Sequence, residues 1–417
     1  MKEQAHPARA LSAGIAALPG AGSAWASAQA AWRFFNNEAV TPDGLAGPLR
    51  EAVRRALDAS RSDHVLVVVD WSKIDYRRHA SKADRRGFCN PGEAGYALTA
   101  ALAVDAATGD PLGPLELELD TAGGTLTTRG GGVRPSVHYV EQVAPLMAAA
   151  GGWGLPRTPV FVMDREYDSL EHYRAWHADE HRFLVRADAN RRLRWEGRSA
   201  LIGEVVAGLR DAGAFAEVRE VTHHGRRLAQ HVAEAAVVLD QPAWKHGADG
   251  TRRRIPGPPL PLRLVVAEVR DEAGAVAATW LLLTNVPAAV PAAEVALWYY
   301  WRWRVETTFK LLKSAGVELE RWQQETAAAI LRRLLVACMA CVTAWHLEAR
   351  DDPASGACKR LLVRLSGRLT KRSRPVTAPA LLAGLRTLLV IEDVLDHHGV
   401  EELLRIARPI LDDLRPP

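Results

Sequence analysis

The chain has 417 residues, 48% of them hydrophobic, so it is too long for one ordinary core and we expect two or three lobes. Its 53 Lys and Arg against 49 Asp and Glu give a net charge of only +4, so any nucleic-acid binding must depend on local basic clusters. Four scattered cysteines argue against a secreted disulfide framework, and the sequence lacks a signal-peptide pattern and an uninterrupted apolar stretch of about 18 residues. We therefore expect a cytoplasmic chain without membrane association.

Residues 1–60 are predicted to form an N-terminal helical region. Ala-rich segments are interrupted at Pro19 and Pro48, and Thr41 followed by Pro42 is typical of a helix cap and the first helical residue. The arginines of this region suit either DNA contact or packing against the next domain, and the sequence favours neither: Arg50, Arg54 and Arg55.

The periodicity changes at His64, where a continuous apolar run over 64–70 ends in a carboxylate. Such a run is typical of a buried central strand, and it places Asp70 at the C-terminal end of that strand. Two further strand candidates, 95–105 and 112–120, are joined by a turn-rich segment, and the second alternates Leu with Glu. We expect the three strands to form an antiparallel meander.

A Gly-rich stretch at 123–136 lacks the Gly-Lys-Ser/Thr ending of a phosphate-binding P-loop. It is expected to be either a substrate-facing loop, with Arg129 and Arg134 available for phosphates, or a simple linker. After a helix predicted over about 136–150, an apolar strand ends in Asp164. The chain thus has a second carboxylate at a strand end.

The order of three strands, a helix, a strand, a helix and a strand predicts an α/β, RNase H-like fold with a mixed sheet covered by helices. We assign 61–186 to the first part of this catalytic core and 187–285 to a β-rich insertion. Basic clusters at 223–227 and 252–254 fall in predicted loops of the insertion. The first contains a His pair without a Cys or acid to complete a metal site, so a phosphate-contacting loop or a solvated hairpin tip is preferred there.

After Pro291 the pattern is helical. A helix over 299–313 would bring five polar side chains onto a stripe about 80° wide. The stripe carries one acid among bases, with aromatic residues interleaved, which suits a polyanion whose phosphate meets a metal-binding carboxylate; a basic, solvated helix with its aromatic residues in the core is the alternative. The stripe consists of Tyr299, Arg302, Glu306, Lys310 and Lys313.

We assign 286–350 to the second part of the core and 351–417 to a C-terminal helical region. Cys338 and Cys341 form a C-x-x-C inside an apolar run, and are expected to be buried small hydrophobes because no second pair lies at zinc-ribbon spacing. The C-terminal region places apolar and basic residues in helical register. It could serve in dimerisation, in DNA backbone contact or as an ordinary helical cap.

Asp70, Asp164 and Glu306 together offer the oxygen ligands that Mg²⁺ prefers. Two divalent ions about 3.5 to 4 Å apart can activate a nucleophile and stabilise a leaving oxygen in phosphodiester cleavage. Two of the carboxylates follow strands and one is on a helix, so rigid elements would fix their separation. Three rival carboxylates, each beside a stronger candidate, are expected to have supporting or structural roles: Asp75, Glu166 and Asp168.

With these residues the chain resembles the DDE transposases of bacterial insertion sequences, of the insertion-sequence-four type that includes the Tn-five transposase. The three carboxylates resemble the Asp-Asp-Glu triad, and the Tyr-x-x-Arg-x-x-x-Glu-x-x-x-x-x-x-Lys spacing from Tyr299 to Lys313 resembles the Tyr-Arg-Glu-Lys signature. The resemblance spans from about Ala31 to the mid-300s, and the β-rich insertion is a further feature of that family.

The resemblance implies a cut-and-paste mechanism. Mg²⁺, or Mn²⁺ in its place, held by the three carboxylates would activate water to nick the element end, and the freed 3′-hydroxyl would form a hairpin that is hydrolysed before strand transfer. The implied partners are double-stranded DNA, both element ends and target, and a second copy in a homodimer. The positions assigned to DNA contact are Tyr299, Arg302, Arg304, Lys310, Lys313 and Trp280, the last either stacking on a flipped base or packing as a core residue.

Two departures from the family pattern stand out. Trp71, Ser72 and Lys73 follow the first carboxylate, where relatives often have hydroxyl residues, and the region before Ala31 is shorter than the end-recognition region of close relatives. The alternatives are a catalytically silent DNA-binding or dimerising inhibitor of transposition, and a metal-dependent DNA nuclease without strand transfer. In each case we expect a bacterial protein associated with the nucleoid.

Overall fold

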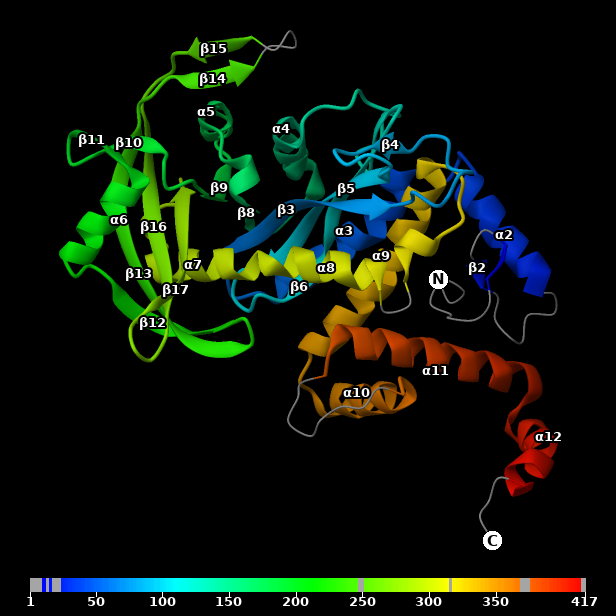
Figure 1. Cartoon of the computed structure of the whole chain (residues 1–417). Helices are drawn as coiled ribbons and strands as arrows, with labels where there is room; N and C mark the ends of the chain where they lie inside the picture. Colours follow the sequence, from blue (N-terminus) through cyan, green and yellow to red (C-terminus); the bar gives the residue numbers. More distant parts are fainter. Residues whose placement is uncertain are drawn as a thin grey trace.

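The computed structural model describes residues 10–12, 15–16, 24–246, 251–314, 317–367 and 376–413. Within them, a 13-stranded mixed sheet runs through the molecule, and helices pack on both of its faces (Figure 1). The predicted α/β class, with a mixed sheet and helical regions at both ends of the chain, is confirmed.

Five strands form the centre of the sheet, in the order β6 (Pro111–Thr121), β5 (Ala94–Asp105), β3 (His64–Asp75), β8 (Thr158–Met163) and β9 (Arg182–Arg186). β3, β5 and β6 form the predicted antiparallel meander, and β8 and β9 continue it with parallel pairing. Val65 to Val69 are all buried. This burial explains the uninterrupted apolar run, because β3 is covered by helices on both faces.

The predicted end of the first strand is wrong. β3 continues beyond Asp70 as far as Asp75. Its parallel pairing with β8 ends at Val68, whereas its antiparallel pairing with β5 continues to Asp75. Asp70 therefore lies where β3 has lost its neighbour on one side, next to the point at which the chain leaves β8 for Asp164.

Residues 187–285 prolong the central sheet. β17 (Val276–Thr284) pairs antiparallel with β9, and β16 (Leu260–Arg270) and β13 (Arg226–Leu239) follow outward. The predicted β-rich character is confirmed. The other elements of this part are β10 (Arg192–Trp195), β11 (Arg198–Leu201), α6 (Ile202–Asp211), β12 (Ala216–His223), and a separate two-stranded ribbon of β14 (Ala243–His246) and β15 (Arg252–Ile255).

The helices on one face of the sheet carry the third carboxylate. They are α7 (Ala292–Trp301), α8 (Trp303–Lys313) and α9 (Ala327–Ala349), while α4 (Tyr139–Ala149) and α5 (Leu170–Ala178) pack on the other face. Among the described helices, α9 alone is long and apolar enough to cross a membrane, but 83% of its most apolar window is buried inside this fold. Cys338 and Cys341 lie in that helix as free, buried thiols, as predicted, and burial raises the pKa of Cys341 to about 12.

The N-terminal part contains two short strands besides its helices, β1 (Ala10–Ser12) and β2 (Ile15–Ala16), which were not predicted. The predicted break at Pro19 lies outside the described residues. Helix α2 (Ala24–Asn36) follows, and α3 (Pro42–Asp58) starts as predicted, with the Thr41 hydroxyl accepting a hydrogen bond from the Gly44 N–H.

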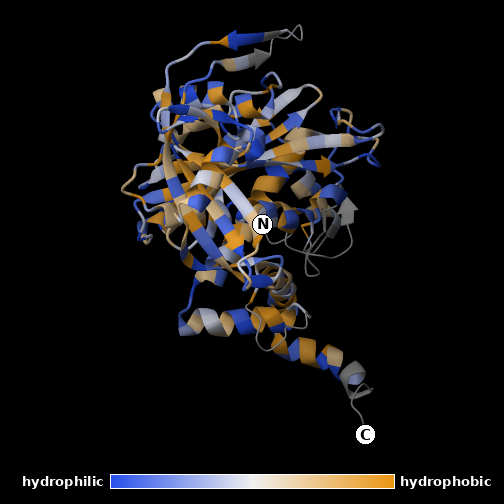
Figure 2. Cartoon of the chain, turned by 60° about the vertical axis from the view of Figure 1, so that its left-hand side comes forward, coloured by the Kyte–Doolittle hydropathy of each residue, from blue (hydrophilic) through white to orange (hydrophobic). Residues whose placement is uncertain are grey.

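The C-terminal part is helical as predicted, and its last helices extend away from the sheet (Figures 1 and 2). Its helices are α10 (Pro353–Leu365), α11 (Ala378–His398) and α12 (Val400–Asp413). Gly399, at φ 71°, separates the last two, a backbone conformation that suits glycine. The basic stretch at 368–375 lies outside the described residues.

Candidate active site

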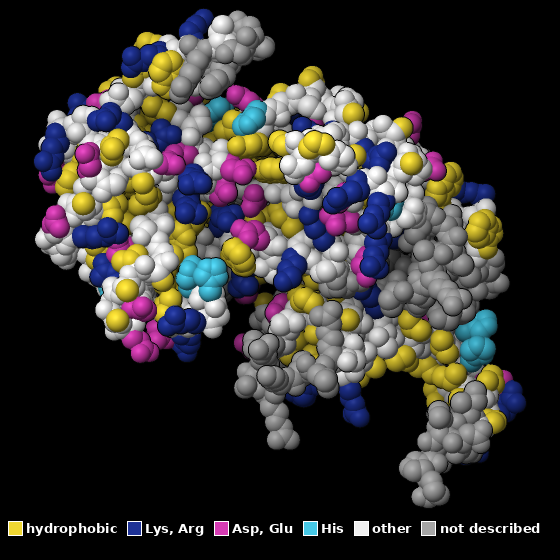
Figure 3. All heavy atoms as spheres, viewed as in Figure 1, with side chains coloured by type: hydrophobic (Ala, Val, Ile, Leu, Met, Phe, Trp, Pro, Cys, Tyr) yellow, Lys and Arg dark blue, Asp and Glu magenta, His cyan; other side chains and the backbone are white. Residues whose placement is uncertain are grey.

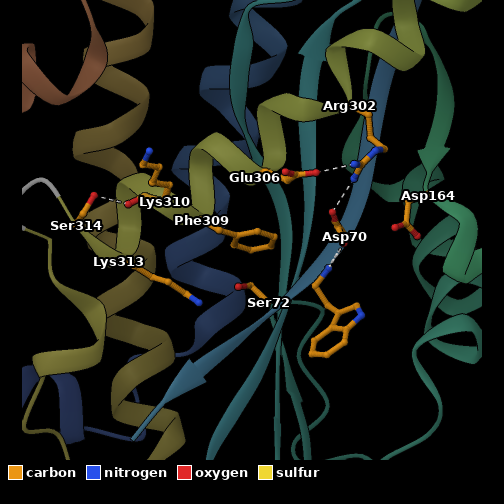
Figure 4. A pocket seen from close by; sticks show the side chains of 10 residues that line it. Asp70, Ser72, Asp164, Arg302, Glu306, Phe309, Lys310, Lys313 and Ser314 are labelled. Carbon is orange, nitrogen blue, oxygen red and sulfur yellow. Dashed lines mark hydrogen bonds and ion pairs between the residues drawn. The ribbon is translucent and has the colours of Figure 1, made fainter. Parts of the chain in front are cut away.

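A pocket of about 540 Å³ lies where β3, the end of β8 and α8 meet (Figure 4). All three predicted carboxylates line it: Asp70 from β3, Asp164 directly after β8, and Glu306 from the first turn of α8. Residues far apart in the sequence are therefore brought together by the sheet and by one helix that crosses its edge. The other residues lining the pocket are Trp71, Ser72, Arg302, Phe309, Lys310, Lys313 and Ser314.

Asp70 is largely withdrawn from solvent, with its side chain 15% exposed. Its Oδ1 accepts a hydrogen bond from the Trp71 N–H at 2.8 Å. Burial raises the pKa of Asp70 to about 6; the Arg302 guanidinium opposes this shift, whereas the nearby Asp164 and Glu306 add to it. The pocket thus holds a carboxylate whose charged form would be stabilised by more positive charge.

Arg302 bridges two of the three carboxylates. Its Nη1 donates to Asp70 Oδ2 at 2.8 Å and its Nη2 donates to Glu306 Oε1 at 2.6 Å. The ring of Tyr299 lies against the guanidinium, 5.8 Å from ring centroid to guanidinium carbon. The predicted continuous helix over 299–313 is interrupted at Arg302, which joins α7 to α8 while keeping right-handed helical dihedral angles of −50° and −32°.

Asp164 holds the turn that follows β8. Its Oδ1 accepts a hydrogen bond from the Glu166 N–H at 2.8 Å and so caps a short 3₁₀ helix, η2 (Arg165–Tyr167). A strand that ends in an Asx-type cap directs the carboxylate out of the sheet edge and into the pocket (Figure 4). The predicted strand-end position of Asp164 is confirmed.

Within the described part of the chain, no three Asp, Glu, His or Cys side chains stand close enough together to hold a metal ion. At this pocket the guanidinium of Arg302 lies between Asp70 and Glu306, in the place where a cation would neutralise them. The donor set itself suits a hard divalent ion, because three carboxylates line one cavity and one of them is desolvated. The donor types therefore suit a divalent metal, and holding one requires that Arg302 turns aside and that the three carboxylates move closer together.

The two predicted lysines both line the pocket but differ in their partners. Lys310 is exposed on α8. Lys313 donates from Nζ to the Lys73 carbonyl, and its Nζ lies 3.4 Å from a carboxylate oxygen of Glu320. Lys310 is thus open to a phosphate, whereas Lys313 would have to exchange protein partners for one.

Tyr299 and Trp280 do not line the pocket. Tyr299 is only 4% exposed and supports Arg302. Trp280 is partly buried on β17, with its ring centroid 6.3 Å from that of Tyr299 and 6.4 Å from that of His223. The structure thus builds a small aromatic cluster between the insertion and the helix junction.

The structure places Arg304 away from the pocket. Its Nε donates to the Gly109 carbonyl at 2.8 Å, on the turn between β5 and β6, and the residue does not line the pocket. Helical geometry explains the difference, because residues 302 and 304 point about 200° apart around the axis. Arg304 fastens the helix to the sheet.

Other basic residues singled out in the sequence are mostly used inside the fold. Arg50 donates from Nε to the Leu115 carbonyl at 3.0 Å, and Arg54 donates to the Trp153 carbonyl at 3.2 Å, which favours the packing alternative for both. Arg55 is 77% exposed and pairs with Glu51. The expectation that Arg129 of the Gly-rich loop is available for phosphates is wrong: its guanidinium lies 2.5 Å from carboxylate oxygens of both Glu116 and Glu118.

The rival carboxylates have other partners. Asp75 accepts from Arg77 Nε at 2.7 Å, and Asp168 pairs with Arg191 at 2.7 Å. Glu166 accepts a hydrogen bond from the indole N–H of Trp71 at 2.9 Å. Glu166 therefore supports the pocket wall, whereas the other two stabilise local structure.

Four residues of the pocket wall were not predicted as site residues. Trp71 stacks on Tyr139, with ring centroids 6.3 Å apart, and Phe309 lies one helical turn after Glu306. Positions three after a helical site residue share its face, so Phe309 could have been found from spacing. The others, Ser72 and Ser314, carried no signal beyond their place next to predicted residues.

A comparison of the sequence with models of protein families identifies the family of this chain. The model of the "Transposase DDE domain" family matches residues 61–342, which is more than half of the chain and includes all three carboxylates. The chain belongs to this family of DDE transposases. No curated protein matches it.

One similar solved structure is a piggyBac transposase synaptic complex with hairpin DNA. Its sequence is 10% identical, its TM-score is 0.34, and the match covers 91% of this DDE transposase and 65% of that chain. This DDE transposase thus spans slightly less than two thirds of the length of that protein.

Proposed function

We propose that this transposase cuts DNA at the ends of a mobile element and joins them to target DNA, by metal-dependent phosphodiester hydrolysis and transesterification. The observation that carries the proposal is the convergence of Asp70, Asp164 and Glu306 on one pocket, with Lys310 exposed beside them. Membership of the DDE family supports the reaction class. The Tyr-Arg-Glu-Lys spacing supports placing the chain with the bacterial insertion-sequence-four type.

Mg²⁺, with Mn²⁺ as a substitute, is the ion that this donor set would hold. Asp70, Asp164 and Glu306 are the residues that would hold it, because hard divalent cations take carboxylate oxygens. When bound, the ion supplies Lewis-acid stabilisation of the charge that develops on a phosphate during cleavage.

Arg302 has two successive partners in this proposal. Without DNA it neutralises Asp70 and Glu306, to which it now donates two short hydrogen bonds. A phosphate entering the pocket offers the planar guanidinium an equivalent pair of acceptors. Arg302 would then orient the DNA backbone, with Lys310 and Lys313 contributing further phosphate contacts from the same helix.

The hairpin route is a finer part of the proposal. It requires a nucleotide to leave the base stack near the cleavage point, which costs a few kcal/mol that stacking on an aromatic ring can offset. The cluster of Trp280, Tyr299 and His223 is connected to the pocket through Tyr299, which lies against Arg302, and it supports this route. The part of Trp280 that is exposed is the surface on which a flipped base would stack.

The proposal is tested by incubating the protein with Mg²⁺ and DNA that carries the inverted repeats flanking its gene. We expect nicks at the repeat ends, hairpins and joined products, all dependent on the metal. Tight binding without cleavage would instead select an inhibitor of transposition. Cleavage without joined products would select a nuclease.

A further inference from the structure

The ribbon of β14 and β15 stands apart from the body of the molecule. Its two strands pair only with each other, and they project beyond the main sheet (Figure 1). Figure 3 shows dark-blue Lys and Arg side chains gathered on this projection. From Gln241 to Leu262 the sequence has one Lys and three Arg against a single acidic residue. We call the ribbon, residues 243–255, the basic arm.

Two arginines of the arm, Arg253 and Arg254, are exposed. Among the residues that the structure describes, no carboxylate pairs with either of them. An isolated two-stranded ribbon is marginally stable in water, so exposed arginines that do not stabilise it are typical of a functional surface.

An aromatic side chain adds to this surface. Trp244 is 47% exposed, and the guanidinium carbon of Arg254 lies 5.7 Å from its ring centroid. The stacked ring limits the motion of a guanidinium whose N–H donors stay free for another partner. An exposed Arg stacked on Trp can therefore contact a phosphate at a smaller cost in side-chain entropy than a free arginine.

The base of the arm is fixed to the catalytic core. Arg174 of α5 donates from Nη2 to the Gln241 carbonyl at 2.9 Å and from Nε to the Pro258 carbonyl at 2.9 Å, so one guanidinium holds both ends of the arm. A Cβ at Gly257 would lie 2.6 Å from Arg174 Nη1, which shows how closely the backbone approaches it. Helix α5 begins six residues after Asp164. The arm thus has a defined position relative to the pocket.

We propose that the basic arm binds the phosphate backbone of duplex DNA away from the cleavage pocket, through Arg253 and Arg254, and so holds a second stretch of the DNA that is being cut. The inference rests on the proposed function, since it assigns a further contact to the same DNA. Duplex DNA suits the arm because a two-stranded ribbon fits into a groove, where Arg253 and Arg254, which point to opposite faces of the ribbon, can reach the phosphate backbones that border it.

The test measures binding of the full-length protein to a duplex of about 60 base pairs of arbitrary sequence over a range of salt concentrations. Each lost phosphate contact lowers the slope of log affinity against log salt by about one, so we expect Arg253→Ala/Arg254→Ala to reduce it by about two and to weaken binding at least tenfold. Arg253→Lys/Arg254→Lys should keep the slope. The comparison includes only variants whose thermal stability equals that of the wild type.

Arg198 provides a matched control. It is also an exposed arginine stacked on a tryptophan, with its guanidinium carbon 5.1 Å from the Trp195 ring centroid, but it lies on β11 in the main sheet. Arg198→Ala should leave the slope unchanged. An equal slope for the wild type and for Arg253→Ala/Arg254→Ala would overturn the arm contact, even if Mg²⁺-dependent cleavage occurs. DNA binding through the arm without any cleavage would instead contradict the proposed function alone.

Discussion

At the residue scale, Arg302 is the cation that pairs with two of the three carboxylates of the pocket. Asp70 and Glu306 both accept hydrogen bonds from Arg302, and burial still raises the pKa of Asp70 to about 6. Without the guanidinium the carboxylates would repel one another across a poorly solvated space. Arg302 and a divalent ion should therefore compete for the same place.

This competition predicts the effect of removing Arg302. Hydrogen bonds between charged groups contribute about 1.5–3 kcal/mol, so Arg302→Ala should bind Mn²⁺ at least tenfold more tightly than the wild type in the absence of DNA. The same variant should be less stable than the wild type without metal and recover stability when metal is added. Arg302→Lys keeps the charge and serves as the control. Electron paramagnetic resonance of free Mn²⁺ measures the affinity, and equal binding by Arg302→Ala and wild type would refute the competition.

The carboxylates could be predicted at this scale because two end apolar runs of the sequence and the third lies in a spaced motif. The pairing of Asp70 with Arg302 could not, since it depends on the register that sets β3 beside α8, whereas Arg302 and Glu306 are four residues apart on one helical face. The position of Arg304 away from the pocket follows instead from its place about 200° around the helix from Arg302. The spacing of a motif shows which residues share a helix face. It does not show which face of the helix is turned toward the pocket.

At the element scale, β6 shows how an alternating pattern can mislead. Alternation of Leu with Glu predicts one solvated face, yet Glu116 and Glu118 are 1% and 2% exposed. Arg129 from the Gly-rich loop faces them in the interior. Burial raises the pKa of Glu116 to about 8 even though this arginine opposes the shift. No local sequence pattern predicted that Arg129, in a loop, would cover the polar face of β6.

The raised pKa predicts how stability depends on pH. The folded state favours protonated Glu116. The stability that this protonated group contributes is therefore fully present below the usual glutamate pKa of 4.5 and is lost as pH rises toward about 8. Glu116→Gln avoids this loss, and its Tm should exceed that of the wild type by about 2–4 °C at pH 8.5 but not at pH 4.5. Glu217→Gln, at a glutamate 63% exposed, is the control. A difference independent of pH would show that Glu116 is not the titrating group.

At the scale of the whole molecule, the insertion and the core share one sheet. The strands of both parts were predicted from composition and periodicity, but the pairing of β17 with β9 joins residues about 100 positions apart and left no local signal. The C-terminal helices extend from this body, and α12 leaves Val400 and Leu404 59% and 56% exposed. These residues share one face of the helix. A second copy of the chain is the partner that we propose for that face, in the DNA-bound homodimer.

The proposed dimer predicts the effect of one substitution on α12. Leu404→Glu places a charge on the apolar face and should prevent dimerisation. We expect the wild-type complex with a pair of DNA ends to contain two protein copies and the Leu404→Glu complex to contain one. Arg405→Glu changes a residue about 100° around the helix from Leu404, outside the stripe shared by Val400 and Leu404, and should leave the dimer intact. Mass photometry of the DNA complexes distinguishes the two states. A wild-type complex with one copy, or a Leu404→Glu complex with two, would contradict the proposed interface.

The central claim is that Asp70, Asp164 and Glu306 act together as the metal-dependent cleavage site. The most direct measurement is the rate of Mg²⁺-dependent nicking of DNA that carries the repeat ends, compared between the wild type and Asp70→Ala, Asp164→Ala and Glu306→Ala. We predict that each substitution abolishes nicking while DNA binding is retained, because each removes a metal ligand. The control is Asp75→Ala, on the same strand as Asp70 but paired with Arg77, and it should nick at close to the wild-type rate. Near-wild-type nicking by any of the three triad variants would contradict the account.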